Sequence, residues 1–149
     1  MLIDQPIADC PDNEWKQCIG SASNPGRSAQ TLARAIQTGF FRDQPASKLL
    51  LVPASGRRHQ LRVHLQSRGH PIVGDATYAN DSDWPLGDAR NPPRMYLHAY
   101  ILKIHLGAQV GLKVLRAPDP FDGILQSVHD APASIETLLG QQGFGLIEA

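Results

Sequence analysis

The chain has 149 residues, of which 42% are hydrophobic and 19% are charged, a composition that excludes an intrinsically disordered protein and fits one globular domain. Its formal net charge is zero at pH 7, so overall charge alone indicates no polyanionic partner. No apolar run approaches the roughly 20 residues that a membrane span requires, and no secretory signal is visible at the N-terminus. We therefore expect an intracellular protein without a membrane-spanning segment.

The first third of the chain predicts loops and short strands. A short strand is expected near residues 2–8, within an otherwise polar N-terminal region. Residues 28–41 are ambiguous, because their apolar positions fit both a helical period and the alternation of a strand. Residues 47–54 are short, apolar and flanked by prolines, which predicts a strand.

The remainder predicts one basic helix and a hairpin. Residues 57–68 contain no proline or glycine and are followed by Gly69, which suits the position just after a helix. Residues 95–106 and 110–114 alternate in polarity around a glycine, as in an antiparallel hairpin. Residues 130–139 predict a short terminal helix. The expected class is α+β, with a mixed, mainly antiparallel sheet and the basic helix packed beside it.

The neutral net charge hides a cationic segment. No acidic residue lies between Asp43 and Asp75, an interval that contains Lys48, Arg57, Arg58, Arg62 and Arg68. Arginines near the start of a helix combine their charges with free backbone N–H groups, which favours phosphate binding. Two other interpretations stay open, namely a solvated basic helix face and a set of internal salt bridges.

Other site chemistries find little support. On a helix, His59 and His64 would lie about 140° apart, too far around the axis to share a metal ion. No cysteine or carboxylate stands at ligand spacing beside them, and no G-x-S-x-G motif is present. We therefore expect neither a metal site nor a nucleophilic serine or cysteine.

Three motifs carry a resemblance. The stretch GRRHQLRVHLQSRGHPIVGDATY (residues 56–78), the later RMYLHAYILKI (94–104) and APDPF (117–121) resemble conserved blocks of the RluA-type RNA pseudouridine synthases. The firm match spans residues 45–122. It implies that residues 1–122 are the C-terminal portion of a pseudouridine synthase catalytic domain, followed at 123–149 by a tail with a short helix.

The resemblance also implies a chemistry. In this family an aspartate attacks a flipped-out uridine, the glycosidic bond breaks, and the uracil is rejoined through carbon, without a metal or organic cofactor. Arg62 matches the arginine that pairs with this aspartate, so it is the expected catalytic residue. RNA is the expected partner. The residues expected to hold RNA or the active-site loop are Arg57, Arg58, His59, Gln60 and Arg68.

The sequence departs from the family pattern in ways that bear on activity. No aspartate begins the family's D-x-x-[TS]-[SA]-G block and no lysine begins its K-x-Y-x-A block. Position 58 is arginine where the family has a small hydroxyl residue, and Asp75 stands in a loop-shaping context rather than a nucleophile's. We thus expect a truncated domain that is inactive alone. Arg62 is expected to be exposed, to pair with another acid, or to await phosphate.

Three interpretations of the whole chain stay open. It is a piece of a working synthase, a short product that binds RNA or a partner without catalysis, or an unstable by-product without function in which the basic helix is merely structural. Half of a mixed sheet would also leave an unpaired edge, and such an edge favours association with another chain.

Overall fold

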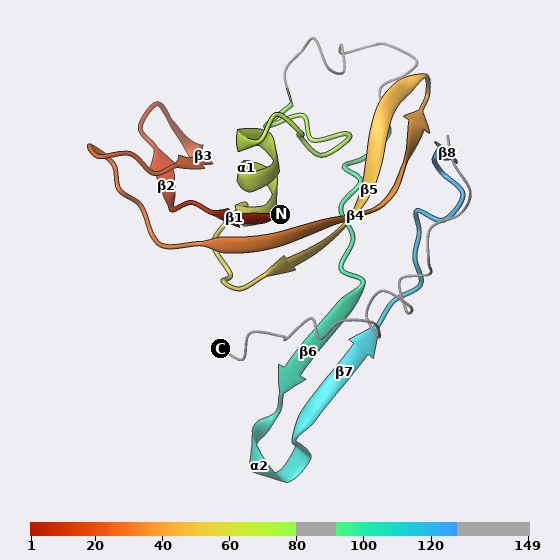
Figure 1. The fold of residues 1–149 in the computed structure, drawn as a ribbon. Coiled ribbons are helices and arrows are strands. Elements are labelled where there is room, and N and C mark those ends of the chain that lie inside the picture. Colours follow the sequence, from red (N-terminus) through yellow and green to blue (C-terminus); the bar gives the residue numbers. More distant parts are fainter. Residues whose placement is uncertain (80–91, 128–149) are drawn as a thin grey trace.

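The computed structural model describes residues 1–79 and 92–127 (Figure 1). The main sheet has the strand order β1-β4-β5, with β8 also paired to β4, and two hairpins, β2-β3 and β6-β7, accompany it. Helix α1 packs against β3, β4 and β5. The strands are β1 Leu2–Asp4, β2 Ile7–Cys10, β3 Asn13–Ile19, β4 Gln30–Phe41, β5 Gln44–Pro53, β6 Ile101–His105, β7 Leu112–Arg116 and β8 Gln126–Ser127, and the helices are α1 Gln60–Ser67 and α2 Gly107–Val110.

Every strand pairing among the described residues is antiparallel. The predicted α+β class is therefore confirmed, with a mainly antiparallel sheet and a basic helix beside it. The arrangement follows from short connections, because neighbouring strands joined by tight turns pair most readily in opposite directions.

Residues 28–41, which fit both a helix and a strand in sequence, form the central strand β4. This strand pairs along its length with β5, while β1 and β8 share its other side. Thr31 and Ala33 alternate inward, and a register irregularity after Ala35 changes which later positions are buried. Pairing on both sides satisfies the backbone of β4, so the tertiary context overrides the helical propensity of its alanines and glutamines.

The strand predicted at residues 47–54 is confirmed and begins earlier, at Gln44. It includes Pro45, which cannot donate a backbone hydrogen bond. No described strand pairs with the second side of β5, and an edge strand is the place where a sheet tolerates proline. The turn from β4 into β5 places Arg42 and Asp43 at φ values of 48° and 65°, as the tight type I′ hairpin requires.

The N-terminal region contains more structure than its sequence indicated. The single strand expected near residues 2–8 is two strands, β1 and β2, which separate at Gln5 and Pro6. Strand β3, which was not predicted, pairs with β2 through a register that shifts after Asp9. Four of the seven β3 residues are polar, and its sequence NEWKQCI lacks the apolar alternation that signals a strand.

Helix α1 is shorter than predicted at its start. It begins at Gln60 rather than at residue 57, because His59 adopts the left-handed conformation with φ 55°. Arg57 and Arg58 therefore lie in the turn before the helix. The predicted end is confirmed: Gly69 has φ 76°, its N–H donates to Gln66 O, and the N–H of His70 donates to Leu65 O.

The core lies between α1 and the strands. α1 contributes one residue to each of two buried apolar clusters, Leu65 to the first and Val63 to the second. The buried members of these clusters are Ile3, Leu65 and Ile72 in one, and Ile7, Ala29 and Val63 in the other. Because Val63 and Leu65 are both packed in the core, the rotation of α1 about its axis is fixed. Arg62 then faces the loop that carries Asp75.

The predicted hairpin near residues 95–114 is confirmed, with shorter strands. β6 and β7 pair from Ile101↔Arg116 to His105↔Leu112, and the one-turn helix α2 connects them. Figure 1 shows this hairpin extending away from the main sheet. Among the described residues, no helix has the length and apolar character needed to cross a bilayer.

The chain beyond residue 122 returns to the sheet. Ser127 and Gln126 of β8 pair with Gly39 and Phe40 of β4. The described part of the predicted tail thus belongs to the main sheet. The helix predicted at residues 130–139 lies outside the described residues.

Candidate functional site

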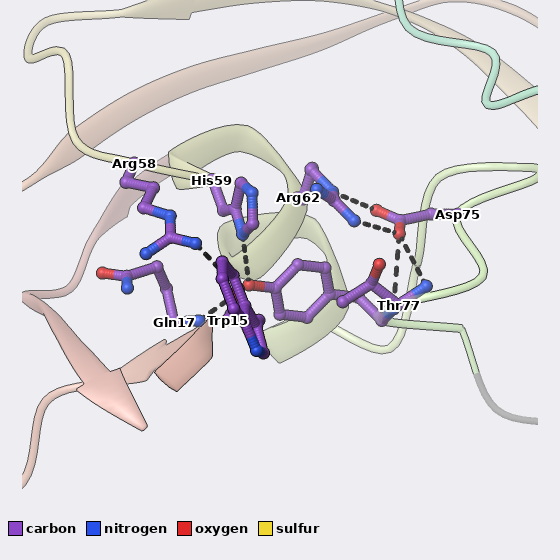
Figure 2. Close-up of polar contacts among 8 residues, drawn as sticks. Trp15, Gln17, Arg58, His59, Arg62, Asp75 and Thr77 are labelled. Carbon is purple, nitrogen blue, oxygen red and sulfur yellow. Dashed lines mark hydrogen bonds and ion pairs between the residues drawn. The ribbon is translucent and has the colours of Figure 1, made fainter. Parts of the chain in front are cut away.

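The candidate site is built on the turn before α1, the first turns of the helix, and the loop at residues 74–78. Figure 2 shows these segments meeting, with the β2-β3 hairpin alongside. The turn contributes Arg57, Arg58 and His59, and the helix contributes Gln60 and Arg62. All five were expected site residues from the sequence.

Gln60 anchors the turn from within. Its side chain is 4% exposed. Its Nε2 donates to Gln30 O at 2.7 Å and to Thr31 Oγ1 at 3.0 Å. Its Oε1 accepts from Ser55 Oγ at 2.8 Å and from the N–H of Arg57 at 3.1 Å. With both ends of the amide engaged inside the protein, the geometry favours the loop-holding role over direct RNA contact, the two roles that the sequence left open.

Arg62 finds an acid, which is one of the three outcomes expected for it. Its Nε and Nη2 each lie 2.7 Å from a different carboxylate oxygen of Asp75. Only 16% of the Arg62 side chain and 1% of the Asp75 side chain are exposed. The hydrogen bond to Asp75 raises the pKa of Arg62 despite the opposing effect of burial. The result is a fixed cation, held in a two-pronged geometry that lysine could not reproduce.

Further contacts hold the loop that carries Asp75. Asp75 Oδ1 also accepts from the N–H groups of Thr77 at 3.1 Å and Tyr78 at 3.3 Å (Figure 2). The preceding Gly74 has φ 76°, and its α-carbon packs against the backbone of Arg94 so closely that a side chain would collide there. Asp75 is therefore a loop-shaping residue, as its G-D-x-x-Y context indicated.

Tyr78 joins the loop to the turn and to β3. Its hydroxyl accepts the backbone N–H of Gln17 at 2.8 Å and lies 2.8 Å from His59 Nδ1. Because Gln17 supplies a hydrogen, the hydroxyl can use its own to donate to His59. The guanidinium carbon of Arg62 lies 4.7 Å from the centroid of the Tyr78 ring, a cation–π contact.

Two pKa shifts follow from this packing. Burial lowers the pKa of His59, and the positive charges of Arg62 and Arg58 lower it further. A neutral His59 is thus favoured, which agrees with its Nδ1 accepting from Tyr78. Burial raises the pKa of Tyr78, so its hydroxyl keeps the proton that this hydrogen bond needs.

The other predicted arginines divide into two locations. Arg58 donates to Glu14 O at 3.4 Å and Trp15 O at 3.2 Å, and Arg57 Nε donates to Ser28 O at 3.1 Å. Both side chains are exposed at the start of α1. Arg68 is also exposed but caps the C-terminal end of α1. The helix separates it from the other two, so these three predicted RNA contacts do not form one patch.

The two histidines considered as metal ligands, His59 and His64, contact different residues. His64 is buried between Thr31 Oγ1 and Gln5 O, whereas His59 contacts Tyr78. Within residues 1–79 and 92–127, no three side chains of the metal-binding types gather around a common point. The two histidines use their nitrogens in separate hydrogen-bond networks.

Sequence reasoning missed the roles of Tyr78, Gln17 and Trp15. Gln17 and Trp15 lie on β3, which had no strand signal, and their approach to the helix depends on long-range packing. Tyr78 belongs to a recognised motif, and its spacing of three residues after Asp75 was the available signal. The partner of Arg62 was likewise inside the quoted motif.

The chain is similar to known RNA pseudouridine synthases. The chain is 44% identical over 98 residues to RNA pseudouridylate synthase domain-containing protein 1 of Bos taurus, covering 66% of this chain and 30% of that protein. It is 36% identical over 121 residues to the dual-specificity RNA pseudouridine synthase RluA of Escherichia coli, covering 80% of this chain and 50% of that protein.

Among solved structures, human RNA pseudouridylate synthase domain containing 1 matches with a TM-score of 0.76 and 33% identity. The match covers 93% of this chain and 57% of the human chain. No family model matches the sequence. The chain spans between about a third and a half of the length of these curated relatives. The shared fold, together with the identity to two sets of relatives, leads to one conclusion: the chain belongs to the RluA-type RNA pseudouridine synthase family.

Proposed function

We propose that the chain binds RNA and forms the arginine-bearing wall of a site for converting uridine to pseudouridine. The observation that carries this proposal is Arg62, the arginine of the family motif, fixed beside Asp75 and Tyr78 next to two exposed arginines. The names of the relatives describe RNA pseudouridine synthases, which supports RNA as the partner.

We further propose that the chain alone does not catalyse the isomerisation, because it is a truncated domain that lacks the nucleophile. None of its aspartates stands in the family's nucleophile block. Asp75, the acid beside Arg62, is an unsuitable substitute. Its side chain is 1% exposed, and its two oxygens are occupied by Arg62 and by two backbone N–H groups. A carboxylate held this way cannot approach a ribose carbon without losing those bonds.

Tritium release from RNA labelled at carbon 5 of uracil tests the catalytic part. The new carbon–carbon bond forms at this position, so each turnover liberates the label. We expect no release by the chain alone. Steady release that is abolished by Arg62→Ala would overturn the proposed inactivity and establish a complete active site in this chain.

RNA binding is tested separately, by titrating a uridine-containing single-stranded RNA at several salt concentrations. Phosphate contacts release counterions, so the affinity should fall as salt rises. Absent or salt-independent binding would contradict the RNA-binding proposal and favour a purely structural role for the basic helix.

The free side of β5 supports a proposal about association. No described strand pairs with that side, and unpaired backbone groups can accept a strand from another chain. We expect light scattering to detect larger species that grow with protein concentration. A monomer throughout the concentration range would contradict this proposal.

A further inference from the structure

Trp15 is an exposed tryptophan at the rim of the candidate site. Its side chain is 70% exposed, although tryptophan is among the largest apolar side chains. The neighbouring residues Asn13 and Glu14 of β3 are also exposed. Such a ring offers a free aromatic face, and aromatic faces on RNA-binding proteins stack on unpaired bases.

Two hydrogen bonds hold the backbone of β3 around Trp15 beside the candidate site. Arg58 Nη2 donates to the carbonyl of Trp15 at 3.2 Å, so the tryptophan backbone lies beside the turn that precedes α1. Two residues further along β3, the N–H of Gln17 donates to Tyr78 OH at 2.8 Å. Trp15 lies at the register shift of the β2-β3 hairpin, between Asn13, which pairs with Cys10, and Gln17, which pairs with Asp9. Figure 2 shows Trp15 together with Arg58 and His59.

The charge beside Trp15 suits a phosphate backbone. Arg57 and Arg58 are exposed and bond to carbonyl groups, and no described carboxylate forms an ion pair with either. Their positive charges are therefore not neutralised within this part of the chain, and each guanidinium has donors to spare. Glu14 adjoins Trp15 in sequence, and its backbone carbonyl accepts from Arg58 Nη1 at 3.4 Å.

We propose that Trp15 is a stacking surface for one unpaired base of single-stranded RNA whose phosphates contact Arg57 and Arg58. The base lies next to the nucleotide that enters the Arg62 site. This inference rests on the proposed RNA binding and adds a residue that holds substrate outside the reaction centre. Stacking recognises the flat face of any base, so the contact adds affinity without selecting a sequence.

The experiment uses the full 149-residue chain carrying Trp84→Phe, so that tryptophan fluorescence reports only Trp15. Two probes are titrated: a short oligouridylate, and a matched oligomer that has the same ribose phosphates but no bases. We expect oligouridylate to quench the fluorescence and the abasic oligomer to leave it unchanged. Trp15→Ala should weaken oligouridylate binding roughly 5- to 150-fold, and Trp15→Phe should retain most of the affinity.

Two variants separate the contribution of base stacking from that of phosphate binding. Trp15→Ala should leave binding of the abasic oligomer unchanged, whereas Arg58→Gln should weaken both probes and reduce the salt dependence by about one phosphate contact. Circular dichroism confirms folding of each variant. Equal binding of oligouridylate by Trp15→Ala and its parent would overturn this inference alone. Failure of the parent chain to bind either oligomer would overturn the proposed RNA binding and this inference together.

Discussion

Arg62 and Asp75 form a two-pronged ion pair in which both N–O distances are 2.7 Å. The carboxylate lies 13 residues after the arginine and is almost completely buried. The arginine that the motif resemblance predicts to be catalytic is thus already paired within this chain. Its charge is compensated, and its position is set by a loop that the same motif encodes.

Replacing Asp75 with asparagine should destabilise the fold. The substitution keeps the shape of the side chain but leaves Arg62 with an uncompensated charge in a largely buried position. Breaking such a pair from one side costs about 3 kcal/mol or more when both groups are buried. We expect urea unfolding to shift to lower concentration by a corresponding amount. Asp12→Asn, at an exposed position, is the matched control and should have little effect. Equal stability of the Asp75 variant and its parent would show that the pair contributes nothing.

Local patterns predicted the parts of this structure that depend on local sequence. The strand β5, the end of α1 at Gly69 and the β6-β7 hairpin all carried turn residues or apolar alternation. The start of α1 carried no such signal, because the sequence does not indicate that His59 adopts a left-handed conformation. Strand β3 was missed since its contacts are long-range, and its polar residues gain their place through pairing and through the bond to Tyr78.

The arginines of the candidate site were predictable from the sequence, but their contacts were not. The resemblance identified Arg62 and the arginines before it, because the motif is contiguous. It could not show whether Arg62 would be exposed, paired with an acid or left for phosphate. That outcome depended on the path of the loop after Gly74, where the chain packs closely against the backbone of Arg94, a contact distant in sequence.

Gly74→Ala should be considerably more destabilising than Gly69→Ala. Both glycines have φ 76°, so an added side chain strains the backbone equally at each position. At Gly74 the new carbon would lie 2.1 Å from Arg94 O, whereas at Gly69 it would meet nothing within 4 Å. We expect a loss of about 1 kcal/mol at Gly69 and roughly 2–5 kcal/mol at Gly74, measured by thermal unfolding. Similar losses at both positions would contradict the close packing of the loop.

His59 should make stability depend on pH in a defined direction. Its pKa in the folded protein is lowered, mainly by burial and then by Arg62 and Arg58. The unfolded chain therefore binds a proton at higher pH than the folded one. The contribution of neutral His59 is fully present above about pH 6.5, the ordinary histidine value, and is lost as the pH falls through the folded pKa.

The test compares unfolding free energies of the parent and His59→Asn between neutral and mildly acidic pH. Asparagine tolerates the left-handed conformation of this position and does not titrate. The five remaining histidines are common to both proteins, so the difference between the two curves isolates His59. We expect the parent to lose more stability on acidification than the variant. Parallel curves would argue against the lowered pKa.

Tyr78→Phe should separate the hydroxyl of Tyr78 from its ring. Phenylalanine keeps the aromatic face that contacts Arg62 but leaves the N–H of Gln17 without its acceptor and His59 Nδ1 without its donor. Because Gln17 is buried, the unsatisfied N–H should cost about 1–3 kcal/mol. Loss of the donor also removes the bond that favours neutral His59, so the pKa of His59 should rise in the variant, as nuclear magnetic resonance of the imidazole can show. Tyr100→Phe is the control, since its hydroxyl makes no hydrogen bond to any residue among 1–79 and 92–127. A Tyr78 variant with unchanged stability and an unchanged His59 titration would mean that the ring packing, and not the hydroxyl, holds the loop against β3.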